Sequence, residues 1–133
     1  MKTEKEQIEQ LLEEKYLNGV ANNMNTHKIL EFFHPDFAIF SSNDRELVKF
    51  PLREWKNVVD AYKADNRGKP GLRELTHKLD YIDVAGNAAT VKLLLSRHGE
   101  LIATDYISLL KIGGEWKVVT KVAYSHVENP FQV

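Results

Sequence analysis

The chain has 133 residues, the usual size of a single domain and long enough to bury a hydrophobic core. Its 18 basic and 19 acidic side chains are interleaved and leave a net charge of −1, which argues against nucleic-acid binding because that requires a clustered basic face. The absence of cysteine excludes disulfides, thiolate nucleophiles and Cys-ligated zinc.

The N-terminal segment predicts a long amphipathic helix. Thr3 and Glu6 form a capping box, in which both side chains satisfy free backbone amides at a helix start. Apolar residues then recur at helical spacing with charges between them: Ile8, Leu11, Leu12, Tyr16, Leu17 and Val20. We therefore expect a helix from near Thr3 to near Ala21.

Two shorter helices and a pair of short strands are expected next. A second helix begins at Asn25 or Thr26 and stops at His34, because the following proline disfavours the helical conformation there. Residues 37–40 and 46–50 have the composition of two short strands joined by a polar turn. A third helix starts at Pro51, since proline suits the first turn of a helix.

From Leu72 onward the apolar residues follow a period of two. Four strands are expected, over Leu72–Val84, Ala88–Arg97, Leu101–Ile112 and Glu115–Val127, separated by glycine-containing turns. Long consecutive strands packed under N-terminal helices predict an α+β fold with an antiparallel meander. Because no repeat or linker interrupts the chain, residues 1–133 are expected to form one domain.

Three stretches carry a resemblance to a known fold family. They are residues 16–19, residues 33–38, and residues 104–122, in which Asp-Tyr-Ile-Ser-Leu-Leu-Lys precedes Gly-Glu-Trp-Lys. With the order of elements, they resemble the nuclear transport factor 2-like superfamily, close to the SnoaL-like polyketide cyclases and the subgroup named putative lumazine-binding. This resemblance implies a cone-shaped, curved antiparallel sheet of the cystatin-like type, with three helices over its concave face and an internal pocket.

Seven residues are candidates for the lining of that pocket: Tyr16, His34, Phe37, Trp55, Asp105, Tyr106 and Lys121. In the ketosteroid isomerases of the superfamily a tyrosine of the first helix donates to a developing oxyanion, and Tyr16 is placed to do the same or to bond a backbone carbonyl. Residues 37–40 lack the carboxylate base that such isomerases need. Trp55 is either a ligand-stacking ring or a core residue, and His34 is either functional or a helix cap.

Asp105 and Lys121 are charges inside otherwise apolar strands, where a charge is costly unless it is paired or solvated. If residues 113–114 form a two-residue turn, Tyr106 lies opposite Lys121. A one-residue change in the length of this loop puts Asp105 opposite Lys121 instead. Either register brings the three residues together, as a polar pocket floor or as an ion pair on the outer or dimer face of the sheet.

No metal or cofactor is expected. The remaining histidines lack the spacing of metal ligands, and no hydrolase, nucleotide-triphosphatase or dinucleotide motif is present. The polar N-terminus, and the lack of an apolar stretch of about 18 residues, predict a cytoplasmic protein without a membrane segment.

The sequence leaves three functions open. The first is a noncovalent binder of a small, apolar or aromatic molecule, without turnover. The second is a cofactor-free proton-transfer enzyme, such as an isomerase, dehydratase or cyclase, which needs Tyr16, His34 or Asp105 with a shifted pKa. The third is a dimeric association module. Both faces of the long strands are mostly apolar, which predicts a homodimer paired through the outer face of the sheet.

Overall fold

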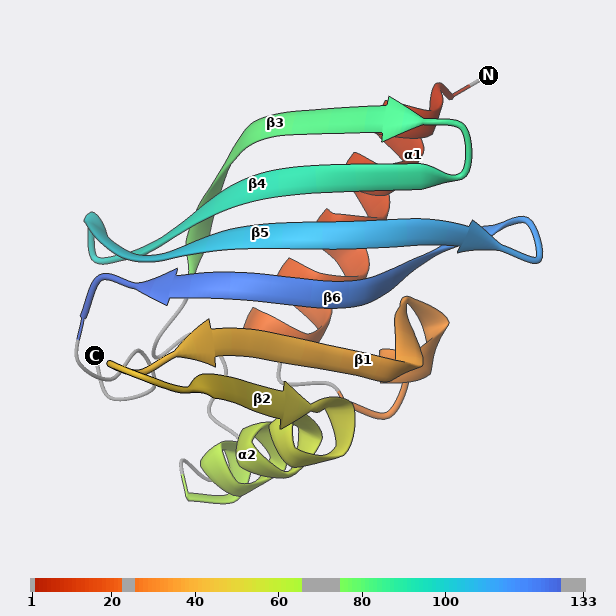
Figure 1. The fold of residues 1–133 in the computed structure, drawn as a ribbon. Coiled ribbons are helices and arrows are strands. Elements are labelled where there is room, and N and C mark those ends of the chain that lie inside the picture. Colours follow the sequence, from red (N-terminus) through yellow and green to blue (C-terminus); the bar gives the residue numbers. More distant parts are fainter. Residues whose placement is uncertain (1, 23–25, 66–74, 128–133) are drawn as a thin grey trace.

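A computed structural model describes residues 2–22, 26–65 and 75–127. These residues form an α+β fold around a six-stranded sheet with the strand order β2-β1-β6-β5-β4-β3 (Figure 1). The strands are β1 (Phe33–Ser42), β2 (Leu47–Pro51), β3 (Thr76–Ala85), β4 (Ala88–Arg97), β5 (Glu100–Ile112) and β6 (Glu115–Ser125). Neighbouring strands are antiparallel except β1 and β6, which are parallel.

The predicted antiparallel meander is confirmed. Strands β3, β4, β5 and β6 pair in the order of the sequence, and Ile112 lies opposite Glu115 as expected for the two-glycine turn. Strand β4 has the predicted bounds, β5 begins one residue earlier and β6 ends at Ser125. Strand β3 begins at Thr76, while residues 72–74 of its predicted start lie outside the described residues.

The first predicted helix consists of two segments of different geometry. Helix α1 (Glu4–Leu11) begins at the predicted cap, where Thr3 Oγ1 accepts a 3.1 Å hydrogen bond from the Glu6 amide. It continues directly as the π-helix η1 (Leu12–Asn22), so the expected length is reached. In Figure 1 this long helical segment runs behind the sheet, across one of its faces.

The second predicted helix is not an α-helix. Its place is taken by a single 3-10 turn, η2 (Ile29–Glu31), and the only other α-helix within the described ranges is α2 (Leu52–Asp65). The reason is that β1 starts earlier than expected, because the Phe32 carbonyl accepts a 2.8 Å hydrogen bond from Val118 of β6. This bond holds the backbone beside β6 and ends the helical turn.

The two faces of the sheet differ in burial. Helices α1 and η1 pack on one face, here called the covered face, against buried side chains of β4, β5 and β6 that include Val91, Leu93, Ile107, Leu109 and Val118. Alternate residues of the same strands point to the opposite face, here called the outer face. Its large exposed residues lie on β3, β5 and β6: Tyr81, Tyr106, Leu110, Val122 and Tyr124. Among the described residues, no helix has the length and apolar character needed to cross a membrane.

Candidate functional site

Three polar side chains meet inside the molecule, between η1 and the covered face. Tyr16 Oη donates a 2.9 Å hydrogen bond to Asp105 Oδ2, and Lys121 Nζ donates a 2.9 Å bond to Tyr16 Oη. Lys121 Nζ also lies 3.4 Å from Asp105 Oδ2. The exposed fractions are 1% for Asp105, 4% for Tyr16 and 8% for Lys121. A phenol therefore bridges a buried ion pair, and we call these residues the polar triad.

The pairing of β5 with β6 places both charges on the covered face. Lys121 lies opposite Ile107 rather than opposite Asp105 or Tyr106, so neither predicted register is right beyond the turn. The cause is a register shift between Ser108 and Leu109, which moves β6 by one residue relative to β5. Asp105 and Lys121 are then diagonal neighbours on one face, a separation that a long lysine side chain can span.

Tyr16 is presented by the π-helix η1. A π-helix has a wider turn than an α-helix, and such turns occur frequently at functional sites. Tyr16 and its neighbour Leu17 are both buried in this segment. Gly19 follows three residues later, and a Cβ added there would lie 3.0 Å from the backbone oxygen of Glu14, five residues earlier. The glycine therefore fits the close backbone approach in the turn that carries Tyr16.

Four aromatic rings, here called the aromatic cluster, pack together beside the polar triad and share Tyr16 with it: Tyr16, Phe33, Phe37 and Trp55. The Phe33 ring centroid lies 4.9 Å from that of Phe37, 5.1 Å from that of Trp55 and 5.8 Å from that of Tyr16. Lys121 Nζ is 5.1 Å from the Tyr16 centroid and 5.6 Å from the Trp55 centroid, within the range of cation–π contacts. The site thus combines an ammonium group, a phenol and several ring faces.

Burial and mutual contact determine the protonation of the triad. Loss of water raises the pKa of Tyr16, and the neighbouring Asp105 carboxylate raises that pKa further, so the phenol keeps its proton. Burial by itself lowers the pKa of Lys121, but the Asp105 carboxylate and the Tyr16 oxygen outweigh this effect and the pKa is raised. Lys121 is therefore an ammonium group, and the triad carries one positive and one negative charge.

Five of the seven predicted site residues meet in this assembly: Tyr16, Phe37, Trp55, Asp105 and Lys121. Tyr106 does not. It lies on the outer face with 41% of its surface exposed, and Lys92 Nζ sits 5.8 Å from its ring centroid. The expectation that Tyr106 shares a cavity with Tyr16 is wrong, because adjacent residues of a strand point to opposite faces and Asp105 occupies the covered one.

His34 takes part in a local turn of β1 instead of the triad. Its Nδ1 accepts a 3.0 Å hydrogen bond from the Asp36 amide, and its side chain is partly exposed. Phe33, in contrast, belongs to the aromatic cluster but was predicted only as part of the second helix. The signal for it was Pro35, because an extended chain around a proline puts Phe33 and Phe37 on the same face.

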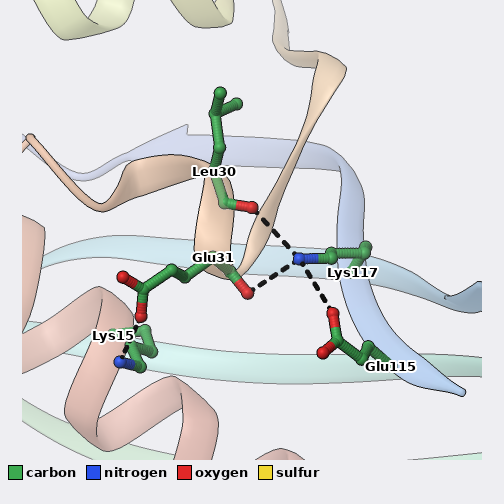
Figure 2. A network of polar contacts seen from close by, with 5 residues as sticks. All are labelled: Lys15, Leu30, Glu31, Glu115 and Lys117. Atoms are coloured by element: carbon green, nitrogen blue, oxygen red, sulfur yellow. Dashed lines mark hydrogen bonds and ion pairs between the residues drawn. The ribbon is translucent and has the colours of Figure 1, made fainter.

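A second polar network lies outside the triad, where η2 meets η1 and β6 (Figure 2). Lys117 Nζ donates to the carbonyl oxygens of Leu30 at 3.0 Å and Glu31 at 2.9 Å, and lies 3.5 Å from a carboxylate oxygen of Glu115. Lys15 Nζ contacts Glu31 Oε1 at 2.8 Å. These residues line an open groove of about 450 Å³ together with His27 and Lys28.

The second polar network holds together the segments that carry the polar triad and the aromatic cluster. Lys15 immediately precedes Tyr16 on η1, and Glu31 lies two residues before Phe33. Lys15 and Lys117 are already engaged with a carboxylate and with carbonyl oxygens, and the groove is open to solvent. We therefore interpret it as support for η2 rather than as a binding site. Within the described residues, no group of three or more His, Asp or Glu side chains has an arrangement that could hold a metal ion.

Known proteins resemble this chain in sequence and in fold. Aldolase FrzH from Cladobotryum sp is 29% identical over 97 residues, which are 72% of each chain. A nuclear transport factor 2-like protein of unknown function from Shewanella baltica OS155 has a TM-score of 0.71 at 21% identity, and covers 96% of this chain and 100% of its own.

Two further solved structures support the same fold. A nuclear transport factor 2-like protein of unknown function from Silicibacter pomeroyi DSS-3 has a TM-score of 0.73 at 16% identity, covering 94% of this chain and 100% of its own. A protein with a cystatin-like fold from Nostoc punctiforme PCC 73102 has a TM-score of 0.61 at 18% identity, covering 96% of both. The family model described as putative lumazine-binding matches residues 3–125. The chain therefore has the fold of nuclear transport factor 2-like proteins and belongs to the putative lumazine-binding family.

Proposed function

We propose that this protein binds a small, planar, largely apolar molecule against the aromatic cluster and Lys121, without turnover. The residues proposed to contact the ligand come from η1, β1, α2, β5 and β6, the elements that carry the polar triad and the aromatic cluster. The family's description and the buried aromatic cluster both support a ligand-binding role. The name lumazine adds a planar, carbonyl-bearing ring system as the first compound to test.

The observation that carries this proposal is the buried polar triad amid aromatic rings. Replacing a buried ion pair by well-packed apolar residues is often neutral or stabilises a protein by about 1–4 kcal/mol. Stability alone therefore does not explain why Asp105 and Lys121 stand among Tyr16 and Trp55. A fixed ammonium beside ring faces does explain it, because small-molecule sites combine aromatic walls with a few placed polar groups.

Calorimetric titration with lumazine tests the proposal. The wild type is expected to bind, and Trp55→Leu is expected to weaken binding by about tenfold or more, because a ring face is lost. Tyr106→Leu is the matched control, since it removes an aromatic ring from the outer face and leaves the affinity unchanged. Absence of heat with lumazine and with planar naphthalene compounds of similar size would contradict ligand binding at this site.

A second candidate function is a cofactor-free enzyme of the proton-transfer or aldol type, and the similarity to aldolase FrzH favours it. A lysine that forms a Schiff base must be a neutral amine, whereas the raised pKa of Lys121 keeps it charged. In this candidate the Lys121 ammonium group polarises a substrate carbonyl instead, and Tyr16 positions Lys121 by accepting its 2.9 Å hydrogen bond. Borohydride treatment in the presence of a β-hydroxy ketone is then expected to trap no adduct. Tyr16→Phe is expected to slow the cleavage of that ketone.

The outer face supports a further proposal, that the protein is a homodimer. Tyr106, Leu110, Val122 and Tyr124 expose large apolar surfaces on adjacent strands β5 and β6. Monomeric proteins seldom expose a contiguous apolar patch of this kind, and two-fold pairing is the commonest way to cover one. A cytoplasmic location and the lack of a nucleic-acid partner stay predictions from the sequence.

A further inference from the structure

The polar triad and the aromatic cluster together are here called the inner site. We infer that this site selects electrically neutral ligands that carry a hydrogen-bond-accepting carbonyl oxygen, and that Asp105 is the residue that sets this preference. This inference rests on the proposed binding function and goes beyond it by naming the ligand class. It follows from the charge of the polar triad and from the donors that Lys121 has left.

The charge balance of the site is the first step. Asp105 and Lys121 are the only two buried charged residues among those that the structure describes, and they lie 3.4 Å apart. The Tyr16 phenol between them is neutral, so the site as a whole has no net charge. A ligand anion would bring a charge into the interior without a free counter-ion, which is costly in a poorly solvated place.

The donors of Lys121 are the second step. An ammonium group has three N–H donors and no acceptor. In the described part of the chain, Tyr16 Oη takes one donor at 2.9 Å and Asp105 Oδ2 lies within reach of a second. The other recorded neighbours of Nζ are the ring faces of Tyr16 and Trp55. One N–H is thus left for an acceptor, and a carbonyl oxygen is an acceptor without charge.

The ring faces are the third step. The ring centroids of Trp55 and Tyr16 are 6.1 Å apart, and both rings lie beside the Lys121 ammonium group. A carbonyl conjugated to a flat ring can therefore meet Lys121 while its ring contacts the aromatic cluster. An aliphatic carbonyl compound would lose the contacts with the aromatic cluster. A flat hydrocarbon would lose the hydrogen bond to Lys121.

Three probes of nearly equal shape separate these contributions: methyl naphthyl ketone, naphthoate and ethylnaphthalene, each titrated into the wild-type protein by calorimetry. The ketone is expected to bind about tenfold more tightly than either of the others, because naphthoate adds an uncompensated charge and ethylnaphthalene has no acceptor. Naphthoate bound as tightly as the ketone overturns the inference, and so does equal binding of ketone and hydrocarbon. The proposed binding function survives both results. If none of the three binds, the binding function and the inference fall together.

Asp105→Asn tests the assigned residue. The substitution leaves Lys121 with an unpaired positive charge, so the preference is expected to reverse toward naphthoate by about tenfold or more. An unchanged preference in a folded Asp105→Asn variant overturns the role of Asp105. Asp80→Asn is the matched control, because Asp80 pairs with Lys92 at 3.3 Å in a more exposed setting, and its probe preference is expected to equal that of the wild type.

A double variant keeps the test decisive if Asp105→Asn does not fold. Asp105→Asn combined with Lys121→Gln removes both charges while keeping the side-chain sizes, and circular dichroism reports whether it folds. The site stays neutral but loses its ammonium donors, so the advantage of the ketone over ethylnaphthalene is expected to shrink by about fivefold. If the ketone keeps its full advantage in this variant, the carbonyl does not bind Lys121 and the inference is wrong.

Discussion

Tyr16 and Asp105 stand 89 positions apart in the sequence, yet the phenol of one donates a 2.9 Å hydrogen bond to the carboxylate of the other. The bond ties the π-helix η1 to the central strand β5, and Lys121 of β6 completes it from the next strand. Because all three groups are buried, each depends on the others for its hydrogen bonds. This dependence makes the triad a constraint on the fold, since η1, β5 and β6 must all be in place for it to form.

Tyr16→Phe is expected to lower the free energy of unfolding by about 1–3 kcal/mol, because Asp105 and Lys121 each lose a buried hydrogen-bond partner. Urea denaturation followed by circular dichroism measures the change. Tyr106→Phe removes an exposed hydroxyl from the outer face, and its effect is expected to stay within about 0.5 kcal/mol. Equal effects of the two substitutions would show that the phenol bridge contributes nothing.

The sequence predicted the meander well, since strand bounds follow from alternation and glycine turns that act locally. It also indicated that Asp105 and Lys121 lie near each other, because the short turn at Gly113 joins their strands, although neither predicted register holds at Lys121. Tyr106 was wrongly expected beside Tyr16, because the register shift between Ser108 and Leu109, which puts Lys121 on the face of Asp105, has no local signal. A slip of one residue exchanges the two faces of a strand.

The second helix and Phe33 show a similar limit. Helical spacing of apolar residues around Ile29 is real, but pairing of the following residues with β6 is a long-range interaction that overrides it. Phe33 accordingly became part of β1 and of the aromatic cluster. The π-helical geometry of η1 was not predictable either, because an amphipathic pattern does not separate a π-turn from an α-turn over so few residues.

Lys121→Met is expected to cost about 3–5 kcal/mol of unfolding free energy, because it leaves the Asp105 carboxylate buried without its counter-ion. The double variant Asp105→Leu with Lys121→Met is expected to lose less than the sum of the two single variants, since the charges disappear together. Lys92→Met is the control, because its partner Asp80 is partly exposed and the loss there stays below about 1 kcal/mol. Strict additivity in the cycle would argue against coupling.

Alkaline pH is expected to weaken the fold through the triad. The raised pKa of Tyr16 and of Lys121 means that the native state keeps protons which the unfolded chain releases above about pH 10. Stability therefore falls as pH rises beyond that value. Ultraviolet absorbance of tyrosinate should show one tyrosine that ionises only as the protein unfolds. Tyr16→Phe removes this late step and Tyr106→Phe leaves it; a late step that persists in Tyr16→Phe belongs to another residue.

A homodimer paired through the outer face predicts a mass of about twice 15.3 kDa in sedimentation equilibrium at micromolar concentration. Val122→Lys puts a charge in the middle of that face and is expected to shift the equilibrium to the monomer. Leu47→Lys is the control, because Leu47 is also an exposed apolar residue but lies on the edge strand β2. A wild-type mass of one chain would contradict the dimer. Dissociation by Leu47→Lys but not by Val122→Lys would place the interface away from the outer face.

Gly19→Ala tests whether the π-helix positions Tyr16. In an ordinary helix interior this substitution stabilises a protein by about 0.5–1 kcal/mol, because alanine is the better helix former. Here the new Cβ would lie 3.0 Å from the Glu14 backbone oxygen, so the turn must shift. We expect a loss of about 1–3 kcal/mol in unfolding free energy, as for other overpacked sites.

Because Tyr16 lies in the same turn, the late tyrosine ionisation is also expected to move to lower pH. Glu13→Ala, at an exposed position of the same helix, controls for helix propensity and is expected to leave the tyrosine step in place. A more stable Gly19→Ala protein with an unchanged tyrosine step would mean that η1 tolerates a side chain there and that Tyr16 is held by Asp105 and Lys121 alone.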